Sequence, residues 1–178
     1  MSGQVEVPPV MVIVSIISLE DHLKESTRIP LESRFGEAEL VSPVYPFDLS
    51  DYYEKEMGSS LSRCWYCFSK LWDASEIAEW KYFCESIENG YLDRKANRTV
   101  NIDPGYLDYS KLVLASFKSA PDKIYMGKGV WAHTCLRYGR GSFTAPDHSF
   151  PDFKDGRFND FMLEARKLYR KLLRQISI

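Results

Sequence analysis

Two carboxylates in an aromatic segment are the first residues of the chain whose types and spacing could serve binding or catalysis. Asp48 and Asp51 stand three positions apart in a predicted loop, directly before Tyr52. Carboxylates placed in this way can bind a cation or hold a substrate hydroxyl. They can equally cap a turn over residues 52–57, which is a common use of Asp before a short helix. Both interpretations stay open.

A second group lies in the string Asn-Ile-Asp-Pro-Gly-Tyr at 101–106. On a strand, Asn101 and Asp103 share one face, while Ile102 belongs to the opposite, apolar face. We expect the two oxygen-bearing side chains at the rim of a pocket, close to Tyr106, as binding or acid–base groups. The alternative is structural, because Asp-Pro-Gly is typical of a turn.

A titratable stripe follows on the predicted strand 130–138. Alternation along a strand puts four of its side chains on one face: Trp131, His133, Cys135 and Arg137. Such a set is unusual for a plain core face. Side chains two positions apart are separated by roughly 6.6 Å, so a nucleophilic pair of His133 and Cys135 would require a side chain to bend. A partly exposed sheet face explains the stripe without any reaction.

Neither the cysteines nor the glycines predict a cofactor site. Cys64 and Cys67 lie three apart in strand-like sequence, so we expect ordinary buried thiols on opposite faces. Cys84 and Cys135 add no second paired spacing of the kind that zinc sites use. The string Met-Gly-Lys-Gly at 126–129 predicts a tight hairpin, because a phosphate loop needs Ser or Thr after the lysine and a helix beyond it. No metal site is predicted, and any cofactor stays unknown.

Composition narrows the class of protein. The 178 residues carry 23 Lys and Arg against 25 Asp and Glu, a net charge of −2, which argues against nucleic-acid or anionic-membrane binding. The longest apolar stretch, at 10–17, is shorter than the roughly 20 residues of a membrane-spanning helix. No basic residue precedes it as in a signal peptide, and the four cysteines are scattered. We therefore expect a cytoplasmic protein of unknown oligomeric state.

The predicted helices and strands must position these residues, and their order indicates an α+β fold. Its first half reads strand, helix, strand, strand, helix, strand, at 10–18, 19–35, 38–47, 61–72, 73–88 and 98–103. This order is the ferredoxin-like βαββαβ arrangement, an antiparallel sheet with two helices on one face. Pro30 should kink or restart the first helix, and Pro43 and Pro46 should confine the second strand to an edge.

The second half predicts an antiparallel β-meander and a final helix. The predicted strands cover 111–118, 124–128 and 130–138, although the short apolar run at 111–117 could equally form a helical turn. A long C-terminal helix that begins near Arg157 packs on the sheet. We expect residues 1–9 to form a flexible lead-in and residues 10–178 a single α+β domain.

Several strings along nearly the whole chain resemble an uncharacterised prokaryotic family that is catalogued as domain of unknown function 4416. They are Pro-Phe-Asp at 46–48, Asn-Ile-Asp-Pro-Gly-Tyr at 101–106, Lys-Leu-Val-Leu-Ala-Ser at 111–116, Lys-Ile-Tyr at 123–125 and Phe-Pro-Asp-Phe at 150–153. The resemblance implies a small soluble single-domain protein. It brings no activity and no catalytic residues.

The leading functional hypothesis is a binding module for a small polar ligand or nucleotide. Its candidate ligand-binding residues are Asp48, Asp51, Tyr52, Asn101, Asp103, Tyr106, Lys111, Tyr125, His133 and Arg137. Lys111 or Arg137 would supply positive charge. The first alternative is a metal-assisted hydrolase or transferase that uses Asp48 and Asp103, which requires these carboxylates to meet over a cleft. The second is a structural or protein-interaction domain, which would show a large exposed apolar patch.

Overall fold

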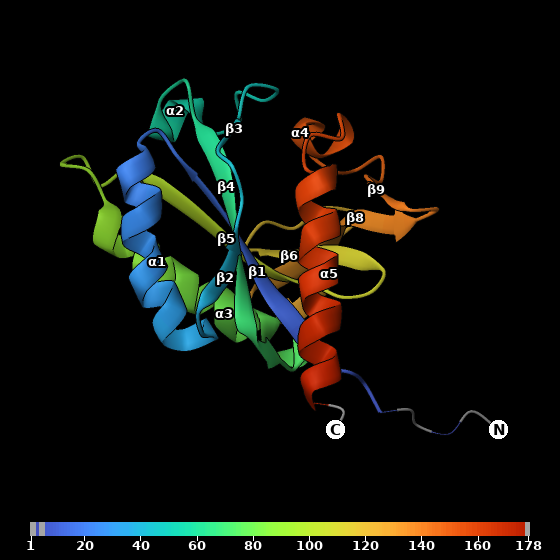
Figure 1. Ribbon diagram of the computed structural model, residues 1–178. Helices are drawn as coiled ribbons and strands as arrows, with labels where there is room; N and C mark the ends of the chain where they lie inside the picture. Colours follow the sequence, from blue (N-terminus) through green and yellow to red (C-terminus); the bar gives the residue numbers. More distant parts are fainter. Residues whose placement is uncertain (1–2, 4–5, 177–178) are drawn as a thin grey trace.

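The computed structural model describes residue 3 and residues 6–176 (Figure 1). The helices and strands are β1 (Val10–Ser18), α1 (Asp21–Phe35), β2 (Ala38–Val41), β3 (Tyr45–Pro46), α2 (Glu54–Met57), β4 (Ser62–Trp72), α3 (Ile77–Glu88), β5 (Val100–Leu107), β6 (Lys111–Ser116), β7 (Ile124–Gly127), β8 (Val130–Gly139), β9 (Ser142–Thr144), α4 (Pro151–Lys154) and α5 (Asn159–Ile176). The predicted lead-in at 1–9 lies partly outside the described residues.

The described strands form one antiparallel sheet of nine strands. Its order is β2-β4-β1-β5-β6-β8-β7, with β3 paired to β4 and β9 paired to β8. The first four strands of this order are those of a ferredoxin-like βαββαβ unit, and the meander continues the sheet beyond β5. The predicted α+β class is therefore confirmed. The second predicted strand, which contains two prolines, becomes β2 and β3 at the edge.

Helices cover both faces of the sheet. α1 and α3 pack on one face, and α5 packs on the other (Figure 1). β1 is buried along its whole length because it lies between these layers: Val12 faces α1 and α3, whereas Ile13 faces α5. Cys64 and Cys67 lie in the two separate cores, as their odd spacing predicts.

α1 runs through Pro30 as one helix, so the predicted restart is wrong. A proline inside a helix costs about 3 kcal/mol, because it lacks an amide donor and crowds the preceding turn. The next residues on the buried side, Leu31 and Phe35, are fully buried. Each such burial contributes roughly 1.5–3 kcal/mol, which outweighs the cost of the proline. Leu19 and Ile29, two apolar residues of the segment 19–35 in which a helix is predicted, are exposed.

β5 shows that the turn interpretation of residues 103–105 is wrong, because the strand runs through them while paired with β1. The backbone amide and carbonyl of Ile102 bond to side chains of α3, so every second residue from Ile102 directs its backbone groups away from β1. Pro104 occupies one of these positions. Its missing N–H costs no ladder hydrogen bond, because the pairing with β6 begins only at Gly105.

Gly105 allows β6 to approach β5 closely. A Cβ atom at residue 105 would lie 1.9 Å from the carbonyl oxygen of Val113 and 2.9 Å from Cα of Leu114. Only a residue without a side chain fits this contact. From here the meander extends toward the side of the sheet that α5 covers (Figure 1), where Leu114 and Cys135 join the core under α5.

Candidate functional site

A small cavity lies between the first half of the sheet and the meander. Its volume is about 40 Å³, about three times the roughly 10–15 Å³ that one water molecule needs. It is lined by Tyr53, Arg63, Asp103, Leu114, Ala115, Ser116, His133, Cys135, Phe150 and Phe153. Charged and titratable groups from β4, β5 and β8 therefore meet in an aromatic surrounding.

Asp103 is held in place by α3 and by its neighbour on β5. The Nζ atom of Lys81, a residue only 3% exposed, lies 3.0 Å from Asp103 Oδ1 and donates to the carbonyl oxygen of Ile102 at 2.9 Å. Asn101 Nδ2 donates to the other oxygen of Asp103 at 2.6 Å. Burial alone would raise the pKa of Asp103, but the charge and hydrogen bond of Lys81 hold that pKa below its usual value. Asp103 is therefore ionised at neutral pH.

Glu88 extends this network to the protein surface. Its carboxylate accepts the backbone N–H of Ile102 and lies 3.6 Å from the guanidinium of Arg98. Arg98 donates to Asn101 Oδ1 at 2.9 Å and makes two hydrogen bonds, of 2.6 and 2.8 Å, to Glu56. Burial raises the pKa of Glu88. Side chains of α3 thus bind the edge of β5 where no strand pairs with it.

Arg63 forms a second buried ion pair on another wall of the cavity. Its Nε lies 2.9 Å from Asp152 Oδ2, and its Nη1 donates to Ser15 Oγ at 2.5 Å. The guanidinium carbon is 5.2 Å from the ring centroids of Phe47 and Phe153, a cation–π arrangement. Asp152 neutralises Arg63, so this pair adds no net charge to the cavity.

His133 and Cys135 contact each other directly. Cys135 has no partner in the register between β6 and β8, so it is the extra residue of a β-bulge. The bulge re-aims its side chain and places Sγ 3.3 Å from His133 Nε2. The predicted alternation is therefore broken, because Leu136 and Tyr138 pack under α5 and Arg137 is exposed on the other face. Burial raises the pKa of the Cys135 thiol, which stays neutral.

His133 carries a buried nitrogen that no other group satisfies. Within the described residues, its Nδ1 has no hydrogen-bond partner. Burial, with the nearby positive charge of Lys123 and the imidazole of His148, lowers the pKa of His133 to about 4. The imidazole is neutral at physiological pH, and its Nδ1 is buried without a hydrogen bond among the described residues.

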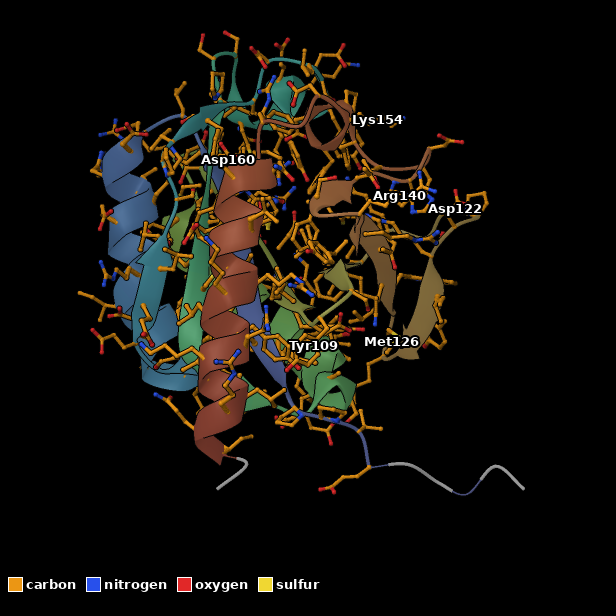
Figure 2. All side chains as sticks on the ribbon, turned by 45° about the vertical axis from the view of Figure 1, so that its right-hand side comes forward. Tyr109, Asp122, Met126, Arg140, Lys154 and Asp160 are labelled. Atoms are coloured by element: carbon orange, nitrogen blue, oxygen red, sulfur yellow. The ribbon has the colours of Figure 1, made fainter. Side chains whose placement is uncertain are left out.

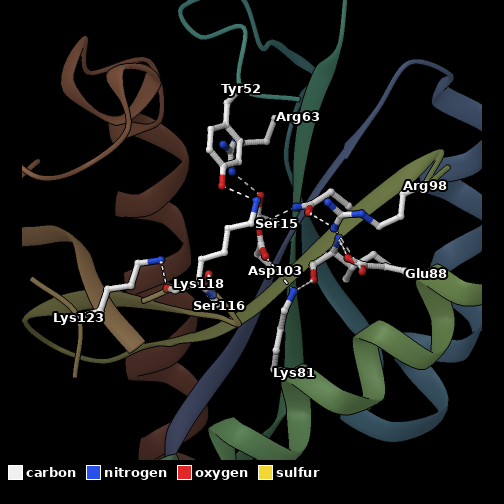
Figure 3. A network of polar contacts seen from close by, with 12 residues as sticks. Ser15, Tyr52, Arg63, Lys81, Glu88, Arg98, Asp103, Ser116, Lys118 and Lys123 are labelled. Carbon is white, nitrogen blue, oxygen red and sulfur yellow. Dashed lines mark hydrogen bonds and ion pairs between the residues drawn. The ribbon is translucent and has the colours of Figure 1, made fainter. Parts of the chain in front are cut away.

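Two lysines of the loop between β6 and β7 lack carboxylate partners within residues 6–176. The ammonium of Lys118 contacts the hydroxyl of Tyr52 and lies 4.3 Å from the centroid of its ring. Lys123 Nζ donates to the carbonyl oxygen of Lys118 at 2.9 Å. Burial lowers the pKa of Lys123. Figure 3 shows Lys118 pointing toward Tyr52 and Lys123 pointing toward Lys118 from the other side.

The contact between Lys118 and Tyr52 lies over the cavity. The ring of Tyr52 packs edge-to-face on Tyr53 and Phe150, both of which line the cavity. The backbone amide of Lys118 donates to Ser116 Oγ, another lining group, at 3.0 Å. Tyr52 itself is 46% exposed. These two side chains therefore stand between the cavity and solvent.

Some of the predicted site residues lie together and others do not. Asn101, Asp103 and His133 lie at the cavity, and Tyr52 lies at its mouth. Asp48 and Asp51 line an open hollow of about 860 Å³, which shares no lining residue with the cavity. Asp48 Oδ1 lies 2.9 Å from a guanidinium nitrogen of Arg157. The two groups of carboxylates therefore form separate sites.

The other predicted residues lie on the α3 side or at the margin of the sheet. Tyr106 and Lys111 line a mainly apolar groove of about 340 Å³, where Lys111 pairs with Asp108. Tyr125 is exposed on β7, and its hydroxyl accepts the N–H of Gly129 at 3.2 Å. Lys111 and Arg137, the expected sources of positive charge, do not line the cavity.

Sequence reasoning missed the residues that do supply the charge. Lys81 and Glu88 occupy the same helical stripe as Ile77 and Cys84, so charged residues at buried positions were the available signal. Arg63 shares a face of β4 with the buried Trp65, two positions further on, so a charged residue at a core position was again the available signal. Lys118 and Lys123 lie in a loop, where no periodicity marks them.

No group of three or more His, Cys, Asp and Glu side chains is placed to hold a metal ion in the part of the chain that the structure describes. No helix there combines the length and the apolar character that crossing a membrane demands.

Comparison with known proteins gives one match. A family model described as "Domain of unknown function (DUF4416)" matches residues 8–169, a range that contains every residue lining the cavity. Searches of curated proteins and of solved structures each found no significant match.

Proposed function

The chain belongs to the DUF4416 family, as the resemblance of its strings predicts, and we propose that it binds a small polar ligand that carries an anionic group. The proposed site consists of the cavity with Tyr52, Lys118 and Lys123 at its mouth, and it is called the lysine pocket below. The charge balance of this pocket carries the proposal.

Arg63, which lines the lysine pocket, and Lys81, which lies behind its wall residue Asp103, each have a carboxylate partner. Lys81 is matched by Asp103 at 3.0 Å and Arg63 by Asp152 at 2.9 Å. Lys118 and Lys123 form no ion pair among the described residues and feel only the longer-range attraction of Glu56 and Asp103, respectively, so the mouth carries a surplus of unpaired ammonium groups. Such a surplus beside a low-dielectric wall raises the local concentration of anions.

The neutral imidazole of His133 supports the same proposal. A buried polar atom without a hydrogen bond costs roughly 1–3 kcal/mol, and His133 Nδ1 is such an atom. If the ring turned so that this buried nitrogen faced the cavity, an oxygen of a bound anion would accept a hydrogen bond from it in the tautomer that protonates it. The ligand would thus remove a cost that the empty protein bears.

The metal-assisted hydrolase or transferase has less support. It relies on Asp48 and Asp103 acting together, but Asp48 pairs with Arg157 at the open hollow and Asp103 pairs with Lys81. A ligand-binding module requires no such meeting. Binding is therefore the function that the geometry supports best.

A protein-interaction role is the second candidate, and an exposed apolar patch favours it. β7 is the last strand of the sheet, and its residues Ile124, Tyr125 and Met126 are exposed, with Ile124 71% exposed. Met126 lies at the outer margin of the molecule (Figure 2). Sedimentation of the wild type and of Ile124→Lys would test this role, which predicts an association that the lysine abolishes.

Thermal unfolding in the presence of a panel of small anions, cations and neutral polar compounds tests the proposed function. A ligand at 100 times its Kd stabilises the folded state by about 2.7 kcal/mol, which raises the Tm of a protein this size by roughly 5–10 °C. We expect anions to raise the Tm of the wild type and of the control Lys95→Gln, whose exposed lysine lies outside the pocket. The double variant Lys118→Gln/Lys123→Gln should lose the response. An equal response in that variant, or none in the wild type beyond a chloride control, contradicts the proposal.

A further inference from the structure

We infer that the anionic group that the lysine pocket accepts is the terminal phosphate of a monoester, with the organic part of the ligand outside the mouth. This inference rests on the proposed function and names the chemical class of its ligand. It follows from the charge, the hydrogen-bond donors and the size of the pocket.

Charge is the first argument. Lys118 and Lys123 bring two ammonium groups without carboxylate partners among the described residues, whereas the cations deeper in the pocket are neutralised by Asp103 and Asp152. A phosphate monoester carries roughly −1.5 to −2 at pH 7 and matches this surplus. A carboxylate or a sulfate ester carries a single negative charge and would leave one ammonium unbalanced.

Hydrogen-bond donors are the second argument. Each lysine ammonium has several N–H donors and uses one on a described partner, the hydroxyl of Tyr52 for Lys118 and a backbone carbonyl for Lys123. The rest remain for a ligand, together with the hydroxyl of Ser116, a residue of the cavity wall. Donors from several directions suit the three terminal oxygens of a phosphate better than the two coplanar oxygens of a carboxylate.

Size is the third argument. The cavity of about 40 Å³ has room for a few water molecules or for one compact group, and three aromatic side chains are part of its wall. Anything larger than a phosphoryl group must extend past Tyr52, which is half exposed at the mouth. A phosphodiester has substituents on both sides and a single charge, so it fits neither the cavity nor the charge surplus.

Calorimetric titration with matched ligands tests this inference on the full chain at low ionic strength and pH 7.5. The ligands are phenyl phosphate, phenyl sulfate, benzoate, diphenyl phosphate and inorganic phosphate. We expect phenyl phosphate to bind at least about tenfold more tightly than phenyl sulfate, benzoate or diphenyl phosphate, a difference of about 1.4 kcal/mol. Inorganic phosphate should bind more weakly than phenyl phosphate, because it lacks the organic part that contacts Tyr52.

Substitution of the two lysines and a change of pH distinguish recognition of a phosphate from general electrostatic attraction of anions. Lys118→Gln and Lys123→Gln should each weaken phenyl phosphate about tenfold or more and reduce its advantage over phenyl sulfate, whereas Lys95→Gln should bind like the wild type. The affinity for phenyl phosphate should fall between pH 7.5 and 5.5, because its second pKa is about 6, while the affinity for phenyl sulfate stays nearly constant over the same range.

The outcomes distinguish the inference from the proposed function. If phenyl sulfate or benzoate binds as tightly as phenyl phosphate and depends on the same lysines, the phosphate inference is wrong and anion binding stands. If inorganic phosphate binds as tightly as phenyl phosphate, the monoester assignment is wrong. If no ligand of the series binds, both the phosphate inference and the proposed function are wrong.

Discussion

Replacing Asp103 by Asn tests whether the buried ion pair with Lys81 holds β5 against α3. The side chain of Lys81 is only 4% exposed, so it would keep its charge in a buried place after losing its partner. Breaking a buried ion pair from one side costs about 3–5 kcal/mol, because the remaining charge is uncompensated. Glu88 and the carbonyl oxygen of Ile102 still stabilise the ammonium, so we expect the lower end of this range, about 3 kcal/mol.

Urea unfolding followed by tryptophan fluorescence measures this loss. The matched control is Asp48→Asn, which breaks the exposed pair with Arg157 and should cost only about 0.2–1 kcal/mol. The double variant Lys81→Met/Asp103→Asn removes both buried charges. It should be more stable than Asp103→Asn alone, because no unpaired ammonium is left in the protein interior.

The pH dependence gives an independent check with a defined sign. The pKa of Asp103 is lower in the folded protein than in the unfolded chain, so its contribution is complete above the unfolded value of about 3.9 and is lost as pH falls through the folded value. The difference between the wild type and Asp103→Asn should therefore shrink below about pH 4. A loss under about 1 kcal/mol at pH 7, or a difference that grows in acid, would refute the reasoning.

Two further variants and one labelling experiment test other parts of the structure. Gly105→Ala should lower the free energy of unfolding in urea by about 3 kcal/mol or more, since the new Cβ would overlap the carbonyl oxygen of Val113. The control Gly139→Ala, whose Cβ would meet nothing within 4 Å, should stay within about 1 kcal/mol of the wild type. Equal losses in the two variants would contradict the close approach of β6 to β5. Because the pKa of His133 is lowered to about 4, the free energy of unfolding should fall as pH drops from about 6.5 toward 4. His133→Gln should reduce this fall by about 1 kcal/mol or more. Parallel pH dependences of the wild type and the variant would contradict the lowered pKa. All four cysteines are buried, so thiol titration should detect them only in urea, and native labelling of Cys135 would show an open site instead.

Much of the fold could be predicted because its signals are local. The apolar run at 10–17 matches a strand covered on both faces, and the predicted helix at 73–88 matches α3, on whose buried side Trp80 and Cys84 lie. The prolines at 43 and 46 mark an edge in the structure as they do in the sequence. Pro30 misled because tertiary burial of its neighbours outweighs a local helix penalty.

The site was less predictable because its geometry depends on pairings that the sequence does not show. The string 103–105 has the composition of a turn, and only its pairing with β1 and the close approach of β6 make it a strand. The bulge at Cys135 breaks the alternation of side chains between the two faces of the sheet, on which any prediction of strand faces from sequence relies. Asp48 shares the residue type of Asp103 but lies in a separate hollow, which no spacing could reveal.

The imidazole signals in an NMR titration test most directly whether an anion enters the lysine pocket. Phenyl phosphate is added at constant pH and ionic strength while the ring signals of His133 and of the exposed His22 are followed together. His22 serves as the internal control, since it lies beside Glu20 on the surface and outside the pocket. We expect saturable shifts at His133, with little change at His22 and no saturation in Lys118→Gln/Lys123→Gln. Unchanged His133 signals at full ligand excess, or equal shifts at both histidines, would contradict binding at this place.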